Sequence, residues 1–168
     1  ILTMTLAMPQ RFASPEARAA LFYVAFFLPA AVQTLLLPIW LDSRGISEEQ
    51  IATIAAVPIA IMVVFNLVVG RIADKASDWR SVIVVASIIA ALASLGFMFV
   101  EGYWGILIVV SLCVIPMMAT EPVIDAATMR LTRRRGSDFA LVRIWGTIGF
   151  IVMSSLAGWI YGWIGIAV

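Results

Sequence analysis

Five stretches of the sequence carry no charged residue, and each is long enough to cross a lipid bilayer. They are 19 to 25 residues long and cover residues 19–41, 50–70, 81–100, 102–120 and 144–168. About 20 apolar residues in a helix span the hydrocarbon core of a membrane. A helix also satisfies its backbone hydrogen bonds within one segment, which hydrocarbon requires. The sequence therefore predicts an all-α membrane protein with a bundle of five transmembrane helices.

The predicted spans, extended to the nearest turn signals, follow a cytoplasmic N-terminal segment of residues 1–18. They lie at about 19–41, 48–70, 81–100, 102–129 and 138–163. Two turns carry capping signals: Ser47 to Gln50 is typical of a capping box, and Asp138 is placed to cap the fifth helix. Small residues recur every fourth position at Ser154, Gly158 and Gly162, a pattern that permits close helix contact. Ile1 is no initiator and Val168 ends an apolar run, so we expect a fragment of a longer chain.

The composition excludes most of the catalytic chemistry that is common in soluble enzymes. Hydrophobic residues make up 63% of the chain and charged residues 12%, against about a quarter charged in soluble domains. There is no histidine and Cys113 is the single cysteine, so disulfides, cysteine or histidine metal sites and histidine-based triads are unavailable. We expect no enzyme, no cofactor, no metal and no nucleic-acid partner. A membrane aspartyl protease would need acids on two helices, whereas Glu121 and Asp125 lie on one.

The distribution of positive charge predicts the orientation. With the N-terminus inside, nine of the eleven lysines and arginines fall in inner segments, one in an outer segment and one within the fifth span. This excess follows the positive-inside rule, so we expect a cytoplasmic N-terminus in the plasma membrane, the inner membrane of a bacterium. The inner residues are Arg11, Arg18, Arg71, Lys75, Arg80, Arg130, Arg133, Arg134 and Arg135.

Two charges of opposite sign lie at matching depth in neighbouring spans. Asp125 precedes Arg130 by five residues and Arg143 follows Asp138 by five, which places each ~7.5 Å inside its helix. Glu121 lies one turn from Asp125 on the same face. We predict a buried ion pair between Asp125 and Arg143 within a polar site on a solute pathway. A structural salt bridge between two helices is the alternative interpretation, although buried pairs are a poor source of stability.

The segment GRIADKASDWR, residues 70–80, resembles the signature loop between the second and third helices of the major facilitator superfamily. Gly70, Asp74, Lys75 and Arg80 match its pattern, whereas Ser77 replaces a glycine and Trp79 a basic residue. The resemblance implies a gating loop that helps to close the cytoplasmic side. It also implies that this bundle belongs to a six-helix half of a twelve-helix transporter.

Two further segments resemble lactose-permease-like proton symporters: LPIWLDSRGIS, residues 37–47, and PVIDAATMRLTRRRGSDFALVRIWGTIGF, residues 122–150. The resemblance implies that Asp125 and Arg143 bind substrate and that Phe150 stacks on a sugar. Those symporters have a tryptophan in place of Phe150 and a small residue in place of Glu121. The RIWGTIGF run looks closer to the phenylpropionate and nucleoside branches of the family.

The function that these resemblances imply is secondary active transport of a small organic solute by alternating access, with proton symport. The expected partners are a sugar, nucleoside or aromatic acid, a proton, the lipid bilayer and the C-terminal half of the same transporter. Glu121, further from Arg143 than Asp125, is the candidate for reversible protonation. The alternatives are a drug–proton antiporter and a non-transporting structural or assembly protein. The chain lacks two features of the antiporters: a basic residue in the middle of helix four and a Gly-Pro motif in helix five.

Overall fold

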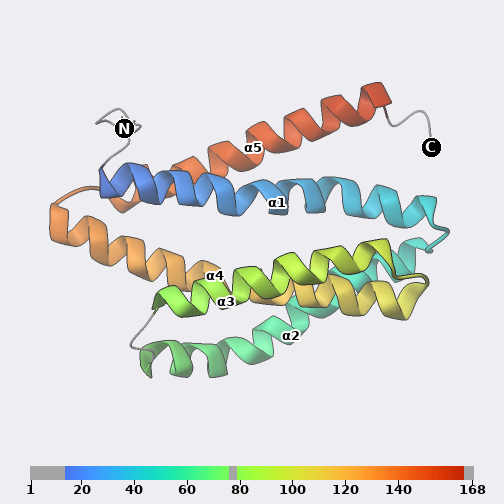
Figure 1. The fold of residues 1–168 in the computed structure, drawn as a ribbon, viewed down its shortest axis with the longest axis horizontal. Helices are drawn as coiled ribbons and strands as arrows, with labels where there is room; N and C mark the ends of the chain where they lie inside the picture. The colour runs from blue at the N-terminus through green and yellow to red at the C-terminus, as the bar shows by residue number, and fades with distance from the viewer. Residues whose placement is uncertain (1–13, 76–78, 165–168) are drawn as a thin grey trace, which may run out of the picture. The chain divides into compact units, whose positions relative to one another are not determined.

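The computed structural model describes residues 14–75 and 79–164, and it describes their side chains except at 65–75, 79, 82 and 164. These residues form helices and turns, with no strand among them, so the predicted all-α fold is confirmed (Figure 1). The elements, in chain order, are α1 (Pro15–Ser43), α2 (Glu48–Lys75), α3 (Trp79–Ser94), a short 3₁₀ helix η2 (Leu95–Met98), α4 (Tyr103–Arg135) and α5 (Phe139–Ile164).

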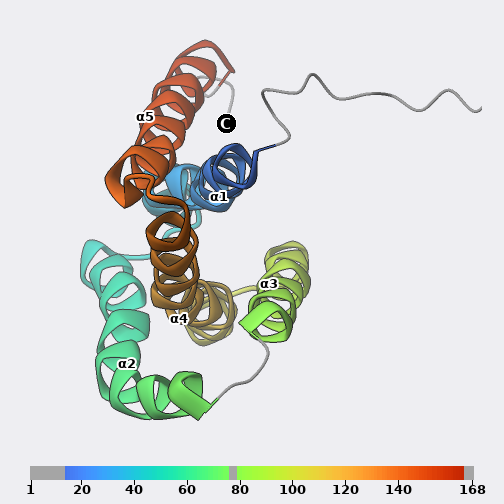
Figure 2. The same ribbon diagram turned by 90° about the vertical axis from the view of Figure 1, so that its left-hand side faces the viewer.

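The chain divides into two compact units, and α1 and α4 contribute to both. The first unit comprises residues Ile1–Leu37 and Thr128–Val168, and the second comprises Pro38–Ala127. The first therefore contains most of α1, the end of α4 and all of α5. In it α1 and α5 lie side by side, as Figures 1 and 2 both show. The second contains α2, α3, η2 and the larger part of α4.

Local sequence signals account for the helix ends. Ser14 caps α1, because its Oγ accepts the backbone N–H of Ala17 at 3.1 Å, and Pro15 occupies the first helical position. The predicted capping box of α2 is present in both directions: Ser47 Oγ accepts the N–H of Gln50 at 3.3 Å, and Gln50 Oε1 accepts the N–H of Ser47 at 3.2 Å.

The connection between α4 and α5 is equally well specified. Gly136 ends α4 with φ of 69°, and the N–H of Ser137 donates to the carbonyl of Thr132 at 3.0 Å, which is the bond of a Schellman motif. Asp138 Oδ1 then accepts the N–H of Ala140 at 2.8 Å and caps α5, as expected. A turn of only three residues therefore joins the two helices.

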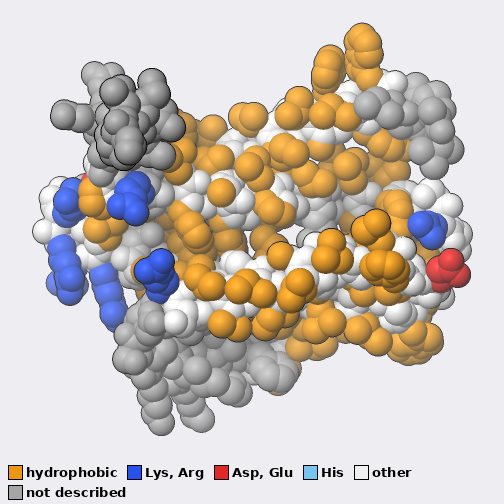
Figure 3. Space-filling view, in the orientation of Figure 1, with side chains coloured by type: hydrophobic (Ala, Val, Ile, Leu, Met, Phe, Trp, Pro, Cys, Tyr) orange, Lys and Arg blue, Asp and Glu red, His pale blue; other side chains and the backbone are white. Residues whose placement is uncertain are grey.

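Three helices in the described part of the chain are long and apolar enough to cross a membrane: Pro15–Ser43, Tyr103–Arg135 and Phe139–Trp163. A shorter apolar helical segment of the third predicted span covers Ile83–Met98, which includes η2. Membrane crossing by α2 and α3 therefore stays a prediction. On the face shown in Figure 3, hydrophobic side chains follow α1 and α5, and basic side chains gather where α1 begins and α4 ends.

Each unit has its own small core. In the second unit Ile54, Met62, Ile106 and Val110 are each no more than 2% exposed, and the Cys113 thiol lies 3.7 Å from the carbonyl of Ala90, which links α4 to α3. In the first unit Tyr23, Ala31, Val142 and Ala157 are buried. Large apolar side chains remain exposed along every helix, as expected where lipid is the solvent.

Candidate functional site

Arg143 lies in the second turn of α5 and is held against aromatic rings of α1. Its Cζ is 4.7 Å from the ring centroid of Phe27 and 5.2 Å from that of Tyr23. Arg143 and Phe27 are half-buried, and Tyr23 is only 1% exposed. All three belong to the first unit. A guanidinium within about 6 Å of a ring centroid is attracted to the face of the ring, so α1 contributes directly to the position of this charge.

Two glycines of α5 allow α1 to approach this closely. A Cβ added to Gly146 would lie 2.9 Å from Cδ2 of Phe27 and 3.3 Å from Nη1 of Arg143. A Cβ added to Gly149 would lie 3.1 Å from Cγ1 and 3.2 Å from the Cα of Val24. All four distances are shorter than side chains normally tolerate. Gly149 therefore lets the two helices touch, and Gly146 leaves room for the Phe27 ring beside the guanidinium.

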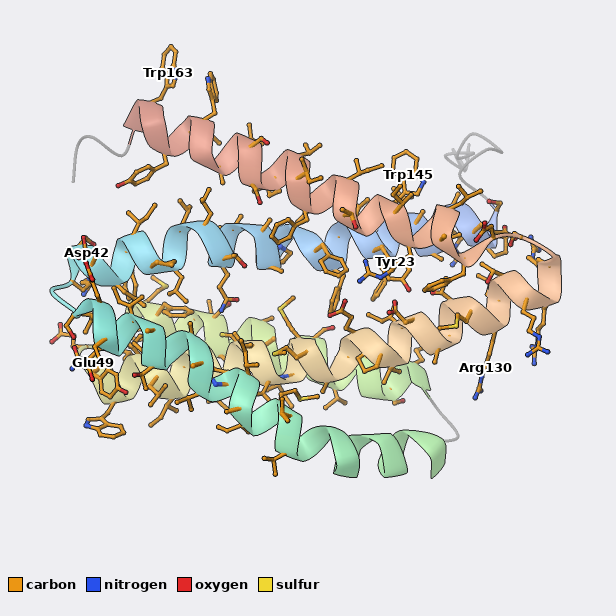
Figure 4. All side chains as sticks on the ribbon, turned by 180° about the vertical axis from the view of Figure 1, so that it is seen from behind. Tyr23, Asp42, Glu49, Arg130, Trp145 and Trp163 are labelled. Atoms are coloured by element: carbon orange, nitrogen blue, oxygen red, sulfur yellow. The ribbon has the colours of Figure 1, made fainter. Side chains whose placement is uncertain are left out.

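The predicted small-residue contact is only partly present. A Cβ at Gly158 would meet Leu35 at an ordinary 3.7 Å, and a Cβ at Gly162 would meet nothing within 4 Å. Among the described residues, the close approach to α1 occurs at Gly146 and Gly149 rather than at Gly162. The reason is geometric: α1 and α5 are nearest in the first part of α5, and α5 ends with exposed Trp163, which projects away from α1 (Figure 4).

An aromatic row extends from the guanidinium along α1. The rings of Phe27 and Phe26 meet edge to face at 5.4 Å, and those of Phe26 and Phe22 stack at 6.3 Å. In Figure 4, Tyr23 lies on the inner side of α1 whereas Trp145 projects outward from α5. Phe150 is half-buried and lies seven residues beyond Arg143, which returns it to the same face of α5. Its expected stacking on a substrate stays a prediction.

The two acids lie on α4 within the second unit. Glu121 and Asp125 are half-buried and separated by one helical turn, next to Val123 and Ile124, which are each 4% exposed. Pro116 and Pro122 interrupt the hydrogen bonds of this stretch. The Thr120 hydroxyl, in a side chain 2% exposed, donates to the carbonyl of Pro116 at 2.7 Å. Asp125 and Arg143 belong to different units, and the ion pair between them stays a prediction.

The residues of the expected gating loop lie largely on helices. α2 continues to Lys75, so Gly70, Asp74 and Lys75 occupy its last turns rather than a loop, and Arg80 is exposed in the first turn of α3. The expected end of the second span at residue 70 is five residues short of the end of α2. The run from Arg71 to Lys75 contains good helix formers, which allow the helix to continue. The side chains of Asp74 and Lys75 lie outside the described residues.

The aromatic rings that support Arg143, and an ion pair at the start of α1, were not predicted from the sequence. Arg135 Nη1 donates to both carboxylate oxygens of Glu16, at 3.2 and 3.3 Å. Tyr23 and Phe27 are one turn apart, a spacing typical of a helix face, but the run around them is uniformly apolar and marks no site. The available signal was Gly146, three residues after an arginine inside an apolar helix.

Comparison with known proteins agrees with this architecture. The model of the MFS_1 like family matches residues 18–168. Among curated proteins, the maltose permease of Geobacillus stearothermophilus is 24% identical over 149 residues, covering 88% of this chain and 38% of the permease. The chain thus spans well under half the length of this relative. No solved structure gives a significant match. Because the family model covers nearly the whole chain, including α1, α4 and α5, the protein belongs to the MFS_1 like family.

Proposed function

We propose that this chain is part of a secondary active transporter that moves a small organic solute across the membrane by alternating access, and that Arg143 binds the solute. The observation that carries the proposal is the half-buried guanidinium of Arg143 within the apolar helix α5, held by Tyr23 and Phe27 of α1. Insertion scales assign a charged side chain at the centre of a membrane helix a cost of ~2.5–3.5 kcal/mol, and such residues mark solute and ion pathways.

Arg143 suits recognition of an oxygen-rich solute. A guanidinium presents five N–H donors in a planar fork, which fits a carboxylate or neighbouring hydroxyl groups with two parallel hydrogen bonds. Asp125 supplies an acceptor for solute hydroxyls and the counter-charge for Arg143, and Phe150 supplies a ring for stacking. In alternating access, two helical halves rock around such a site and expose it to one side at a time. The second half is the C-terminal half of the same transporter.

The substrate classes in the proposal are sugars, nucleosides and aromatic acids. The relative is named a maltose permease, so a sugar is the first to test, whereas the additional acid Glu121 distinguishes this chain from lactose-permease-like proteins. Glu121 is the proposed site of reversible protonation in a proton symport cycle. Gly70, Asp74, Lys75 and Arg80 are proposed to control closure on the cytoplasmic side of a bacterial inner membrane, where the N-terminus also lies.

The decisive experiment is a comparison of single and double neutralisation in the full-length transporter. Asp125→Ala or Arg143→Ala leaves one buried charge without its predicted partner and should lower both membrane expression and uptake. The double variant Asp125→Ala/Arg143→Ala removes both charges and should restore expression. If the pair binds solute, the restored protein takes up no maltose, nucleoside or phenylpropionate from a radiolabelled panel. Substantial uptake by the double variant would show that the pair is only a structural bridge.

A further inference from the structure

We propose that Phe27 is a positioning residue for the Arg143 guanidinium and that Gly146 is required because it leaves room for the Phe27 ring. This inference rests on the proposed function, in which Arg143 binds the solute, and it adds two residues on which that binding depends. Neither residue carries a charge or a hydrogen-bonding side chain. They contribute by fixing the position and the plane of the Arg143 guanidinium, which has both a charge and hydrogen-bond donors.

The first step concerns the ring. The Cζ of Arg143 lies closer to the centroid of Phe27, at 4.7 Å, than to that of Tyr23, at 5.2 Å. The interaction with a ring face is electrostatic and does not use the in-plane N–H groups as conventional hydrogen-bond donors. A ring in contact with a guanidinium therefore restricts the rotamers that the arginine can adopt. This is the geometry that a solute-binding arginine requires before the solute arrives.

The second step concerns the space for that ring. An added methyl at Gly146 would approach Cδ2 and Cε2 of Phe27 at 2.9 and 3.2 Å and Nη1 of Arg143 at 3.3 Å. One carbon at this position would thus crowd both members of the cation–π pair. Gly146 is buried and lies one turn from Arg143 on α5. The added methyl would displace the ring, the guanidinium or both. A substitution at Gly146 is therefore expected to change the position of the charge directly.

Gly149 provides a matched comparison within the same helix pair. It is also buried, and a methyl there would meet Val24 of α1 at 3.1 and 3.2 Å, but it would meet no atom of Arg143 or Phe27 within the three nearest contacts. Alanine at either glycine therefore disturbs packing between α1 and α5. Only alanine at Gly146 also disturbs the cation–π pair. A difference between the two variants isolates the positioning effect from helix packing.

The first test measures the contact between the Phe27 ring and the Arg143 guanidinium. In full-length transporter labelled with ¹⁵N-arginine, the Nε–H resonance of Arg143 is assigned by its loss in Arg143→Lys. Protons above an aromatic face are shifted upfield by the ring current, so Phe27→Leu should move this resonance downfield and Phe27→Tyr, which keeps a ring, should not. Gly146→Ala should move it, and Gly162→Ala, whose methyl meets open space, should leave it in place. An unshifted resonance in Phe27→Leu would overturn the proposal.

The second test reads the consequence for solute binding. Phe27→Leu should raise KM for the transported member of the panel by about 2- to 30-fold, the range that corresponds to loss of a cation–π interaction. The maximal uptake per molecule should change less, and Phe27→Tyr should restore KM. Gly146→Ala should raise KM more than Gly149→Ala at equal membrane expression. An equal rise in both glycine variants, or no rise in Phe27→Leu, would show that the residues serve packing alone.

The two proposals fail in different ways. If the parent takes up no member of the panel, the proposed function fails, and the resonance of Arg143 still decides whether Phe27 positions the guanidinium. If the parent transports and Arg143→Ala abolishes uptake while Phe27→Leu changes neither resonance nor KM, the proposed function stands and the positioning role is refuted.

Discussion

Two arginines of this protein, Arg143 and Arg44, lie over aromatic rings in very different surroundings. The Cζ of Arg44 is 4.9 Å from the ring centroid of Trp40, close to the 4.7 Å that separates Arg143 from Phe27. Arg44 is exposed in the turn after α1, next to Gly45, whose φ is 74°. Arg143 is half-buried inside α5. The same kind of interaction therefore occurs both in a connecting turn and within an apolar helix.

The comparison teaches that distance alone does not rank such contacts. Cation–π attraction contributes ~0.5–1 kcal/mol at exposed sites and ~2 kcal/mol or more where water is excluded. Arg44 is exposed, so water can supply hydrogen-bond partners to it, whereas the half-buried Arg143 is less accessible to water. Trp40 in turn contacts Phe97 edge to face at 5.7 Å, so its ring has a packing role independent of Arg44. We therefore expect Arg44 to be replaceable and Arg143 to be indispensable.

Replacement of Arg143 by lysine is expected to have the largest effect. Lysine keeps the charge but not the planar fork, so Arg143→Lys should abolish high-affinity uptake even if the protein reaches the membrane. Uptake of the solute panel by the full-length variant, normalised to membrane expression, measures this effect. Retained uptake at the parent KM would mean that only charge is needed, and the contrast with Arg44 would lose its chemical basis.

Neutralisation of Glu121 sharpens the comparison between Arg143 and Arg44. Of these two arginines, only Arg143 is predicted to have acids at a matching depth in a neighbouring helix. Glu121→Gln keeps the size of the side chain and removes its ability to exchange a proton. If Glu121 titrates during transport, solute binding should lose part of its dependence on pH. Equilibrium binding across the pH range of the parent measures this change, with Glu101→Gln in the outer turn as the control. Parallel profiles for the parent and Glu121→Gln would remove Glu121 from the proton cycle.

A smaller effect is expected at Arg44, the exposed one of the two arginines. Arg44→Gln removes a cation–π contact that contributes ~0.5–1 kcal/mol, and water satisfies the groups that remain. Uptake should stay near the parent value, and the thermal midpoint of unfolding should fall only slightly. A loss of uptake as complete as that of Arg143→Lys would contradict the ranking by environment and would assign Arg44 a direct role in transport.

The smallest effect is expected at the ion pair between Glu16, which lies before the expected first span, and Arg135, which lies after the expected fourth span. Hydrogen bonding to the backbone at the start of α1, followed by the Arg135 guanidinium, holds the pKa of Glu16 below its usual value. A lowered pKa contributes stability above the pKa of the unfolded chain, and this contribution is lost as pH falls through the folded-state pKa. Because Arg135 is 49% exposed, solvent screens the pair.

Glu16→Gln should therefore lower thermal stability slightly at neutral pH. The difference between variant and parent should vanish in acid below the folded-state pKa of Glu16, where the parent carboxyl is protonated as well. Thermal unfolding of purified protein in detergent as a function of pH measures this. A difference that is the same at every pH would show that Glu16 acts through something other than its charge.

Much of the fold could be predicted from the sequence because the relevant signals are local. Uncharged runs of about 20 residues predict membrane helices. Caps such as Ser47, Gln50 and Asp138 act on backbone groups two or three residues away, and the structure contains the bonds that they predict. The expected ends were least accurate at two places: α2 runs on to Lys75, and α3 gives way to η2 at Leu95.

The arginine within the fifth helix was also visible in the sequence, because a charge interrupts an apolar pattern wherever it occurs. Its partners on α1 were not. Tyr23 and Phe27 lie more than a hundred residues before Arg143, in a run where every side chain is apolar or aromatic and none stands out. Gly146 and Gly149 likewise look like ordinary helix glycines until the distances to Phe27 and Val24 are known.

The sequence by itself thus determined the solvent, the helices, their caps and the charge inside α5, since each depends on composition or on neighbours within a few residues. Only the tertiary structure decided which helix touches Arg143, which glycines permit that contact and that Glu16 meets Arg135. Those outcomes depend on how two helix surfaces fit together. Such a fit depends on the shapes of both helix surfaces together, so it cannot be predicted from the sequence of either helix alone.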